Sequence, residues 1–246
     1  MKVAVLGKVD PKGLSFLIEN EFKVIEIESF EIQNLKEQLK DVDGILLRTT
    51  KLDKEILEHC DNLKIISRHG VGYDNVDLDF LNENKIALCI TSTSNAVSVA
   101  EHVLSFFIYL TKKLSLSDSL VKEGNFEKRS ELPNFFELYK KKVLIIGFGR
   151  IGKEVAKRCL GFDMEVYVYD PFLDNEIIIR NQCIPIEKNQ GLAIADFITI
   201  HLPLNRDTKN FISQTELNLM RKNSILVNTS RAVSYTHLRA HETYPH

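Results

Sequence analysis

A glycine-rich turn between two apolar runs constrains this chain more than any other feature. Residues 142–146 read Lys-Val-Leu-Ile-Ile, and Gly147, Gly149 and Gly152 follow in G-x-G-x-x-G spacing. Gly147 allows a tight turn out of a strand, Gly149 lets the backbone approach a pyrophosphate, and Gly152 lets the next helix pack closely on the strand. That helix directs its unpaired N-terminal amides and the positive end of its dipole at the phosphates. The turn therefore predicts a dinucleotide site.

An acidic residue at the end of the next apolar run distinguishes between the nicotinamide cofactors. Asp170 closes the run at residues 165–169 and lies eighteen positions after Gly152. This is close to the separation of about 20 residues at which an acid binds the adenosine ribose hydroxyls. A carboxylate at that position repels a 2′-phosphate, so the sequence favours NAD over NADP.

The composition argues against several classes of partner. With 246 residues, 44% of them hydrophobic, the chain can bury one large core or two of medium size. It carries 32 Lys and Arg residues against 34 Asp and Glu residues, and the net charge of -2 favours neither nucleic acid nor an anionic membrane. No apolar run has the length of a membrane span.

The four cysteines are scattered along the chain, at Cys60, Cys89, Cys159 and Cys183. They lack C-x-x-C spacing and so predict neither a metal site nor a redox motif. We expect buried free thiols, which suit a reducing cytoplasm.

Apolar runs alternate with helical stretches in the first part of the chain. The sequence predicts helices near residues 14–20, 32–39 and 54–60, between strands at 3–6, 22–27, 44–47, 63–67 and 86–90. Such alternation favours a parallel sheet covered by helices on both faces.

The pattern changes after residue 95. A long helix is predicted over residues 95–114, because apolar side chains recur there at helical spacing. A polar stretch over 115–142 precedes the glycine turn, and later strands are expected at 165–169, 196–200 and 224–228. The sequence therefore predicts two α/β domains, at residues 1–95 and 96–232.

Five separated motifs carry a family resemblance that spans about residues 1–232. They are Ser-Arg-His-Gly-Val-Gly-Tyr-Asp-Asn-Val-Asp (67–77), Asn-Ala-Val-Ser-Val-Ala-Glu-His (95–102), Gly-Phe-Gly-Arg-Ile-Gly (147–152), His-Leu-Pro-Leu (201–204) and Asn-Thr-Ser-Arg (228–231). The chain resembles the D-isomer-specific 2-hydroxyacid dehydrogenases, and within them the D-3-phosphoglycerate dehydrogenase branch. The resemblance implies a flavodoxin-like substrate domain followed by an NAD-binding Rossmann domain.

The same resemblance implies where substrate binds. The loop after the fourth strand presents backbone amides to the substrate carboxylate, and here these belong to Val71 and Gly72. A plain turn is the alternative for this loop. Arg48 matches a position from which phosphoglycerate enzymes contact substrate, although a solvated loop is nearly as good an interpretation. Arg48 and the two threonines that follow it could hold a phosphate.

Arg231 is the main catalytic side chain that the resemblance implies. It would grip the substrate carboxylate and polarise the 2-oxo group, because its planar guanidinium bonds two oxygens and stays charged. It would also stabilise the negative charge that builds on the carbonyl oxygen. The implied cofactor contacts besides the glycines and Asp170 are Arg150, Ile151, Leu202, Thr229 and Ser230.

The histidines do not supply the expected base. The family uses a histidine backed by a glutamate, both downstream of the arginine. His201 matches a residue of the cofactor groove, His102 is interpreted as a packing or interface residue, and His69 precedes the carboxylate loop. His237 and His241 have the i, i+4 spacing of a metal pair but no acidic third ligand, so no metal site is predicted.

The sequence after Ala232 does not continue the family pattern. Residues 233–246 resemble one reading frame of a sequencing-library adapter, and we expect a non-native tail after a truncated second domain. The chain as written is then expected to be catalytically inactive. Dimerisation through the long helix and the following loop is implied by the resemblance for the full-length protein.

The sequence therefore predicts an NAD-dependent oxidoreductase that acts on a small D-2-hydroxy acid, with 3-phosphoglycerate as one candidate. A non-catalytic NAD-sensing corepressor of the same fold is an alternative, because a sensor need not keep the glutamate and histidine. A formate dehydrogenase relative is a third interpretation, which the carboxylate-loop motif disfavours.

Overall fold

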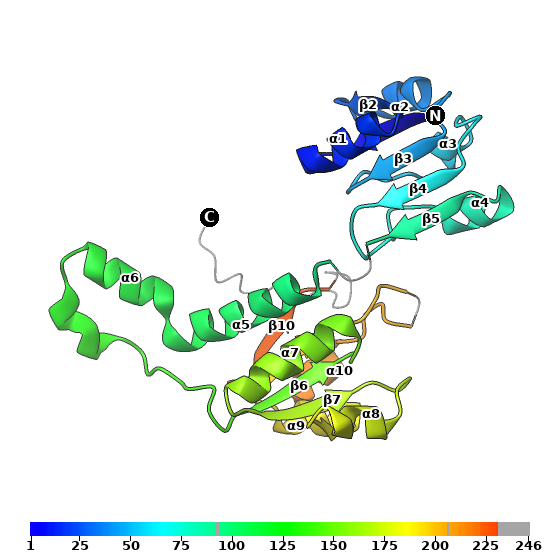
Figure 1. The fold of residues 1–246 in the computed structure, drawn as a ribbon. Coiled ribbons are helices and arrows are strands. Elements are labelled where there is room, and N and C mark those ends of the chain that lie inside the picture. Colours follow the sequence, from blue (N-terminus) through cyan, green and yellow to red (C-terminus); the bar gives the residue numbers. More distant parts are fainter. Residues whose placement is uncertain (92–93, 206, 231–246) are drawn as a thin grey trace. The chain divides into compact units, whose positions relative to one another are not determined.

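The computed structural model describes residues 1–91, 94–205 and 207–230. The chain divides into two compact units, Met1–Asn95 and Ala96–His246, hereafter unit 1 and unit 2 (Figure 1). Each unit is an α/β fold built on one five-stranded parallel sheet. The predicted fold class is confirmed.

Unit 1 alternates strands and helices from its first residues. Its sheet has the order β2-β1-β3-β4-β5, which is the flavodoxin-like order. The elements are β1 (Lys2–Leu6), α1 (Pro11–Glu19), β2 (Lys23–Ile27), α2 (Ile32–Gln38), β3 (Gly44–Leu47), α3 (Lys54–Leu57), β4 (Ile65–Arg68), α4 (Leu78–Glu83) and β5 (Ala87–Ile90).

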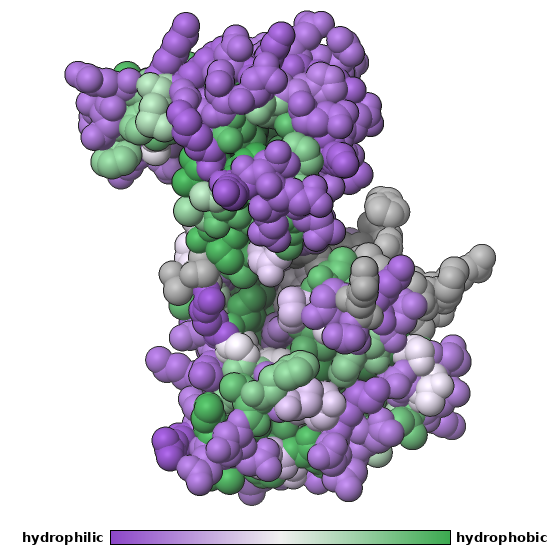
Figure 2. Space-filling view, turned by 90° about the vertical axis from the view of Figure 1, so that its right-hand side faces the viewer, coloured by the Kyte–Doolittle hydropathy of each residue, from purple (hydrophilic) through white to green (hydrophobic). Residues whose placement is uncertain are grey.

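The core of unit 1 lies on one face of its sheet. Alternate strand residues such as Leu6, Leu47 and Ile66 are fully buried there with side chains from α2, α3 and α4. Helix α1 contributes no buried residue, so it covers its part of the unit only lightly. In Figure 2 the visible surface of unit 1, at the top, is mainly hydrophilic, in keeping with this inward gathering of apolar side chains.

Unit 2 contains the glycine-rich turn. Its sheet has the order β10-β9-β6-β7-β8, the order of the first five strands of a Rossmann fold. The elements are α5 (Ala96–Lys112), α6 (Leu114–Lys122), the 3-10 helix η1 (Phe126–Glu131), β6 (Lys142–Ile146), α7 (Arg150–Gly161), β7 (Glu165–Tyr169), α8 (Asn175–Arg180), β8 (Ile184–Pro185), α9 (Lys188–Ile194), β9 (Phe197–Ile200), α10 (Gln214–Leu219) and β10 (Ile225–Asn228).

The sheet of unit 2 has a core on each face. Val143 and Ile145 of β6 pack with α5 and α7, while Leu144 and Ile146 of the same strand pack with α9 and α10. All four side chains are completely buried, which explains why β6 is a continuous apolar run. The strand that leads into the glycine turn is therefore fixed from both sides.

Two sequence predictions need correction here. The helix predicted over 95–114 ends at Lys112, because Lys113 adopts a left-handed conformation with φ of 50° and a second helix, α6, begins at Leu114. The stretch over 115–142 was predicted only as polar, and it contains most of α6 and all of η1. Cys89 lies exposed on β5, whereas the other three cysteines are buried as expected.

No helix in the described part of the chain is both long enough and apolar enough to cross a membrane.

Candidate functional site

The glycine turn lies where the chain reverses the direction in which it adds strands. From β6 the sheet grows through β7 to β8, and the chain then returns to place β9 and β10 on the other side of β6. Ligands of open parallel sheets bind at the carboxyl ends of the strands at such a switch point. The ends of β6 and β9, at Gly147 and His201, meet at this position in unit 2.

Close contacts between backbone atoms shape this turn. Gly147 has φ of +91°, and a Cβ on it would lie 2.8 Å from the carbonyl oxygen of His201. A Cβ on Gly152 would lie 2.2 Å from the carbonyl oxygen of Gly147. No other residue fits at either position without a shift of the backbone. The predicted steric roles of these two glycines agree with this geometry.

The second glycine of the motif lies beside open space. A Cβ on Gly149 would meet no atom within 4 Å, so its lack of a side chain serves no contact within the described protein. Gly149 is also the residue that caps α7, whose first residues are Arg150 and Ile151. The first amides of a helix have no acceptor within it, and they provide hydrogen-bond donors for an anion at this position.

Asp170 contacts the turn directly. Its Oδ2 atom accepts the backbone N–H of Phe148 at 2.8 Å, and its Oδ1 atom accepts the N–H of Phe172 at 3.0 Å. Phe148 is fully buried between the first two glycines, and the N–H of Gly147 donates to the carbonyl of Tyr169 at 2.9 Å. The end of β7 thus holds the turn by accepting two hydrogen bonds from it, one at the carbonyl of Tyr169 and one at the side chain of Asp170.

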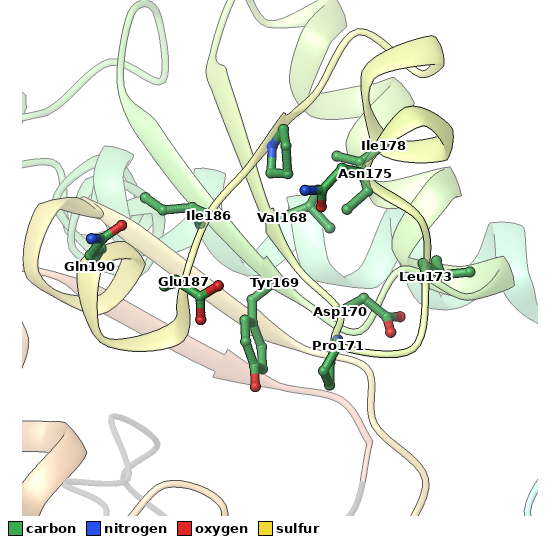
Figure 3. Close-up of a pocket in the computed structure, with 11 residues that line it drawn as sticks. Val168, Tyr169, Asp170, Pro171, Leu173, Asn175, Ile178, Ile186, Glu187 and Gln190 are labelled. Carbon is green, nitrogen blue, oxygen red and sulfur yellow. The ribbon is translucent and has the colours of Figure 1, made fainter.

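A pocket of about 480 Å³ opens beside Asp170. It lies at the carboxyl ends of β7 and β8, and it is lined by Tyr169 at the end of β7, by Pro171 in the loop that follows, and by Glu187 after β8 (Figure 3). Two carboxylates, Asp170 and Glu187, therefore line one pocket. Such a lining is compatible with hydroxyl groups and unfavourable for a phosphate.

The loop after β9 covers the other side of the turn. A Cβ on Gly147 would lie 3.1 Å from Cδ2 of Leu202, so this side chain is adjacent to the turn. The Nε2 atom of His201 lies 3.0 Å from Oγ1 of Thr199, which is completely buried. Burial lowers the pKa of His201 to about 4, so its imidazole is neutral at physiological pH.

The end of β10 carries two further predicted cofactor residues. Asn228 Oδ1 accepts hydrogen bonds from both the backbone N–H and the hydroxyl of Ser230, at 2.9 and 2.6 Å. The hydroxyl of Thr229 is buried and has no hydrogen-bond partner among the described residues. An orphaned buried hydroxyl of this kind offers a donor and an acceptor to a ligand. Arg231, the predicted catalytic residue, lies outside the described residues.

The candidate carboxylate loop follows β4 in unit 1. Gly70 has φ of +148°, and the space beside it is filled by the guanidinium of Arg68, since an added Cβ would lie 1.4 Å from Nη1. The side chain of Arg68 also donates to the carbonyl of His69. The amides of Val71 and Gly72 have no hydrogen-bond acceptor among the described residues. The loop therefore presents two unpaired donors close to a positive charge.

Arg48 follows the neighbouring strand β3. It is exposed, and its Nη1 atom donates to the carbonyl of Lys8 at 3.0 Å. A pocket of about 530 Å³ lies at the ends of β1 and β3, and its lining includes Thr49, Thr50 and Lys51. The structure thus brings the two threonines predicted for a phosphate into a pocket, whose lining does not include Arg48.

The buried cysteines have no sign of reactivity. Burial raises the pKa of Cys60 and Cys183 to about 11 and that of Cys159 to about 12, so these groups stay protonated at neutral pH. In the ranges 1–91, 94–205 and 207–230, no three potential metal ligands gather into a group.

Sequence reasoning passed over several side chains at these loops. Arg68 and Asn75 belong to the motif over residues 67–77, but no role was predicted for either. In the structure the guanidinium of Arg68 lies beside Gly70, and Asn75 donates a hydrogen bond to the loop after β3. Their position on either side of a glycine loop was the available signal. Glu187 gave no signal, because its place in the same pocket as Asp170 depends on the short strand β8, which was not predicted.

Comparison with known proteins gives this geometry a context. Residues 104–237 match the family model of the D-isomer-specific 2-hydroxyacid dehydrogenase NAD-binding domain. The chain is 32% identical over 232 residues to D-3-phosphoglycerate dehydrogenase of Archaeoglobus fulgidus, covering 94% of this chain and 44% of the relative. It is also 32% identical over 232 residues to hydroxypyruvate reductase of Thermotoga maritima, covering 94% of this chain and 74% of the relative. The chain spans less than half the length of the phosphoglycerate dehydrogenases that it matches.

Solved structures share the fold. The D-lactate dehydrogenase of Aquifex aeolicus, complexed with NAD and lactic acid, matches with a TM-score of 0.84 and 27% identity over 96% of this chain and 71% of its own. The NAD-dependent formate dehydrogenase of Staphylococcus aureus, in complex with NAD, matches with a TM-score of 0.83 and 30% identity over 95% of this chain and 75% of its own.

Proposed function

Because the chain belongs to the D-isomer-specific 2-hydroxyacid dehydrogenase family, we propose that the protein transfers a hydride between a small D-2-hydroxy acid and NAD. The observation that carries this proposal is the glycine turn, in which Gly149 leaves open space at the start of α7 while Asp170 holds the turn. In this proposal residues 1–95 bind the substrate and residues 96–232 bind the cofactor.

The residues of unit 2 fit NAD by their chemistry. The amides at the start of α7, including those of Arg150 and Ile151, are suited to the pyrophosphate, and Asp170 is suited to the adenosine ribose. The buried hydroxyl of Thr229 is available to hydrogen-bond the cofactor. Ser230 and Leu202 lie on neighbouring loops at the same edge of the sheet. When bound, NAD supplies the C4 carbon that accepts or gives the hydride.

The substrate is held by its carboxylate in this proposal. The unpaired amides of Val71 and Gly72 bind carboxylate oxygens, and the guanidinium of Arg68 adds a positive charge beside them. Arg231 keeps the role that the family resemblance gives it, to hold the carboxylate and polarise the C2 oxygen. A phosphorylated acid is the first substrate to test, because Thr49, Thr50 and Lys51 line a pocket at the neighbouring strand end and Arg48 adjoins them.

Enzyme function is favoured over NAD sensing. The relatives are named as dehydrogenases and reductases, and no feature of the described residues favours a corepressor. A reducing compartment such as the cytoplasm suits the four unpaired thiols.

We also propose that the full-length protein forms a homodimer through α6 and η1. Helix α6 has no buried residue and extends beyond the end of α5, away from the sheet of unit 2 (Figure 1). Val121 and Phe126 of this arm are 62% and 59% exposed. Exposed apolar side chains gathered on one projecting element are typical of an interaction surface. Sedimentation of the Val121→Asp variant, expected to be monomeric, tests this proposal.

The cofactor assignment is tested by titrating the chain into NADH and into NADPH while cofactor fluorescence is followed. The chain contains no tryptophan, so the cofactor signal is free of tryptophan emission. We expect NADH to bind at least about tenfold more tightly than NADPH, because Asp170 and Glu187 oppose a phosphate. In Gly149→Ala the added methyl meets no described protein atom, so binding should fall while stability is kept. Equal affinity for the two cofactors, or no binding of NADH, would contradict the assignment.

A further inference from the structure

The carboxylate loop of unit 1 is tied to the neighbouring loop by a side chain to which no role has been assigned. We propose that Asn75 is a positioning residue that fixes the loop after β4 to the loop after β3, so that the two loops bind one substrate as a unit. This inference rests on the proposed function, because it takes Val71 and Gly72 as the carboxylate site.

Three hydrogen bonds join the two loops. The Nδ2 atom of Asn75 donates to the carbonyl of Thr50 at 2.7 Å. The backbone N–H of Leu52 donates to the carbonyl of Asn75 at 2.8 Å, and the N–H of Asp77 donates to the carbonyl of Leu52 at 3.1 Å. Leu52 and Val76 form an isolated parallel bridge. The contact therefore behaves as a short extra piece of sheet beyond the ends of β3 and β4.

The backbone part of this contact is protected from water. Leu52 and Val76 are both buried in the core of unit 1. Asn75 is half-buried, and its Oδ1 atom is shielded without a hydrogen-bond partner in the described part of the chain. The side chain therefore acts through its amide donor, which satisfies the carbonyl of Thr50, a partly buried residue. An aspartate of the same shape would place an acceptor against that carbonyl.

The contact closes the loop that carries the proposed carboxylate amides. At one end the pairing of β3 and β4 continues past the strands, since the N–H of His69 donates to the carbonyl of Leu47 at 2.7 Å. At the other end Asn75 holds the chain to Thr50. Val71 and Gly72 lie between these two attachments, and Arg48 directly follows Leu47, which pairs with Arg68 at the end of β4. Adjacent strands run about 4.8 Å apart, so the two attachments determine how the amides face the loop after β3.

The test uses the full chain and two measurements on the same samples. Amide hydrogen exchange is followed by NMR, and sodium oxalate is titrated while the amide signals of Val71 and Gly72 are observed. The variant is Asn75→Leu, which keeps the size of the side chain without its donor, and Asn75→Ala serves if the leucine does not fold. Asn20→Leu is the matched control, because Asn20 donates from Nδ2 to the carbonyl of Phe16 at 2.8 Å at the end of α1, in the same unit and in a part of the sequence away from both loops.

We expect Asn75→Leu to speed exchange at Leu52 and Asp77 by about tenfold and to weaken oxalate binding by about tenfold, with exchange in β3 and β4 unchanged. The control should match the parent in both measurements. Uniformly faster exchange across unit 1 would show that Asn75 stabilises the whole unit and not these loops, and it would overturn the inference. Unchanged oxalate affinity would also overturn it. If the parent amides do not respond to oxalate, the carboxylate role in the proposed function fails, and exchange at Leu52 and Asp77 still decides whether Asn75 joins the loops.

Discussion

The two candidate ligand loops lie at the carboxyl edges of similar parallel sheets, but they are held in place by different forces. In unit 2 the turn after β6 is held by close contacts, because Gly147 and Gly152 leave no room for a Cβ. In unit 1 the loop after β4 is held by hydrogen bonds from Asn75 and Leu52. In that loop the Cβ position of Gly70 is also crowded, but by the end of a flexible arginine side chain.

This difference determines how each loop tolerates change. A backbone carbonyl cannot move out of the way of a new methyl group without moving the strand or helix that carries it. A guanidinium can rotate, and a hydrogen-bonded loop can open and close. The turn in unit 2 is therefore expected to be rigid before ligand binds, whereas the loop in unit 1 depends on a few polar contacts for its order.

The largest effect is expected for Gly152→Ala. The new Cβ would lie 2.2 Å from the carbonyl oxygen of Gly147, so α7 must move away from β6. We expect a loss of unfolding free energy on the order of 3 kcal/mol and a loss of NADH affinity of about 100-fold or more. Urea unfolding and NADH fluorescence measure the two effects.

Gly161→Ala is the control for this substitution. Gly161 ends the same helix, and an added Cβ meets no atom within 4 Å. Its stability should stay the same or rise by up to about 1 kcal/mol, because alanine favours a helix over glycine. If both variants were equally stable, the turn of unit 2 would not be held by close contacts, and the comparison with unit 1 would fail.

A smaller effect is expected for Gly70→Ala in unit 1. The φ of +148° disfavours any side chain, but the crowding atom belongs to the mobile end of Arg68. The expected loss of stability is about 1–2 kcal/mol, from backbone strain alone. NADH affinity should be unchanged, since Gly70 lies in the other unit. Gly13→Ala, in open space on α1, is the control, and a loss as large as that of Gly152→Ala would contradict the contrast between the loops.

The same contrast explains what the sequence could and could not predict. A turn held by close contacts needs glycines at set positions. The spacing of Gly147, Gly149 and Gly152 therefore predicts the turn from the sequence alone. A loop held by Asn75 uses a residue type that is common in every loop, and its partner Thr50 is 25 positions away. The break between α5 and α6 at Lys113 was missed for a related reason, because neither glycine nor proline marks it.

Strands were predicted better than the helices that follow them. The predicted bounds of β3 and β7 match the observed ones. Strand β3 is apolar and largely buried on both faces, and β7 alternates its buried Val166 and Val168 with less buried residues, so both patterns are typical of strands. Helix α4 was missed, although Asp77 caps it by accepting the N–H of Phe80, because it directly follows a motif interpreted only as a ligand loop. The hydrogen bond from the Phe148 amide to Asp170 joins two strand ends and is visible only in the folded structure. The sequence therefore predicted the acidic residue but not that it also holds the turn.

Substitution of Asp170 separates its charge from its contact with the turn. Asp170→Ala removes the acceptor of the Phe148 amide and should weaken NADH binding by about tenfold to 30-fold. Asp170→Asn keeps an oxygen acceptor without the charge, so it should retain more NADH affinity and narrow the preference over NADPH. If the two variants bound NADH equally, the hydrogen bond to the turn would contribute nothing, and only close contacts would hold unit 2.

The smallest expected effect is a dependence of stability on pH, and it is confined to unit 2. His201, whose carbonyl packs against Gly147, has a pKa lowered to about 4 by burial, against about 6.5 in an unfolded chain. A lowered histidine pKa means that the unfolded state binds the proton first. This contribution to stability is therefore complete above about pH 6.5 and is lost as the pH falls towards 4.

Lowering the pH from about 7.5 to 5.5 should accordingly cost unit 2 roughly 1 kcal/mol and loosen the turn next to His201. Urea unfolding followed by NMR signals of each unit measures this loss separately for the two sheets. In His201→Gln the side chain can still meet Thr199 but no longer titrates, so the slope in this pH range should flatten. His102→Gln, which removes an exposed imidazole from the same unit, is the control and should keep the parent slope. An equal loss in unit 1, or an unchanged slope in His201→Gln, would show that the acid sensitivity does not come from the residue that closes the glycine turn.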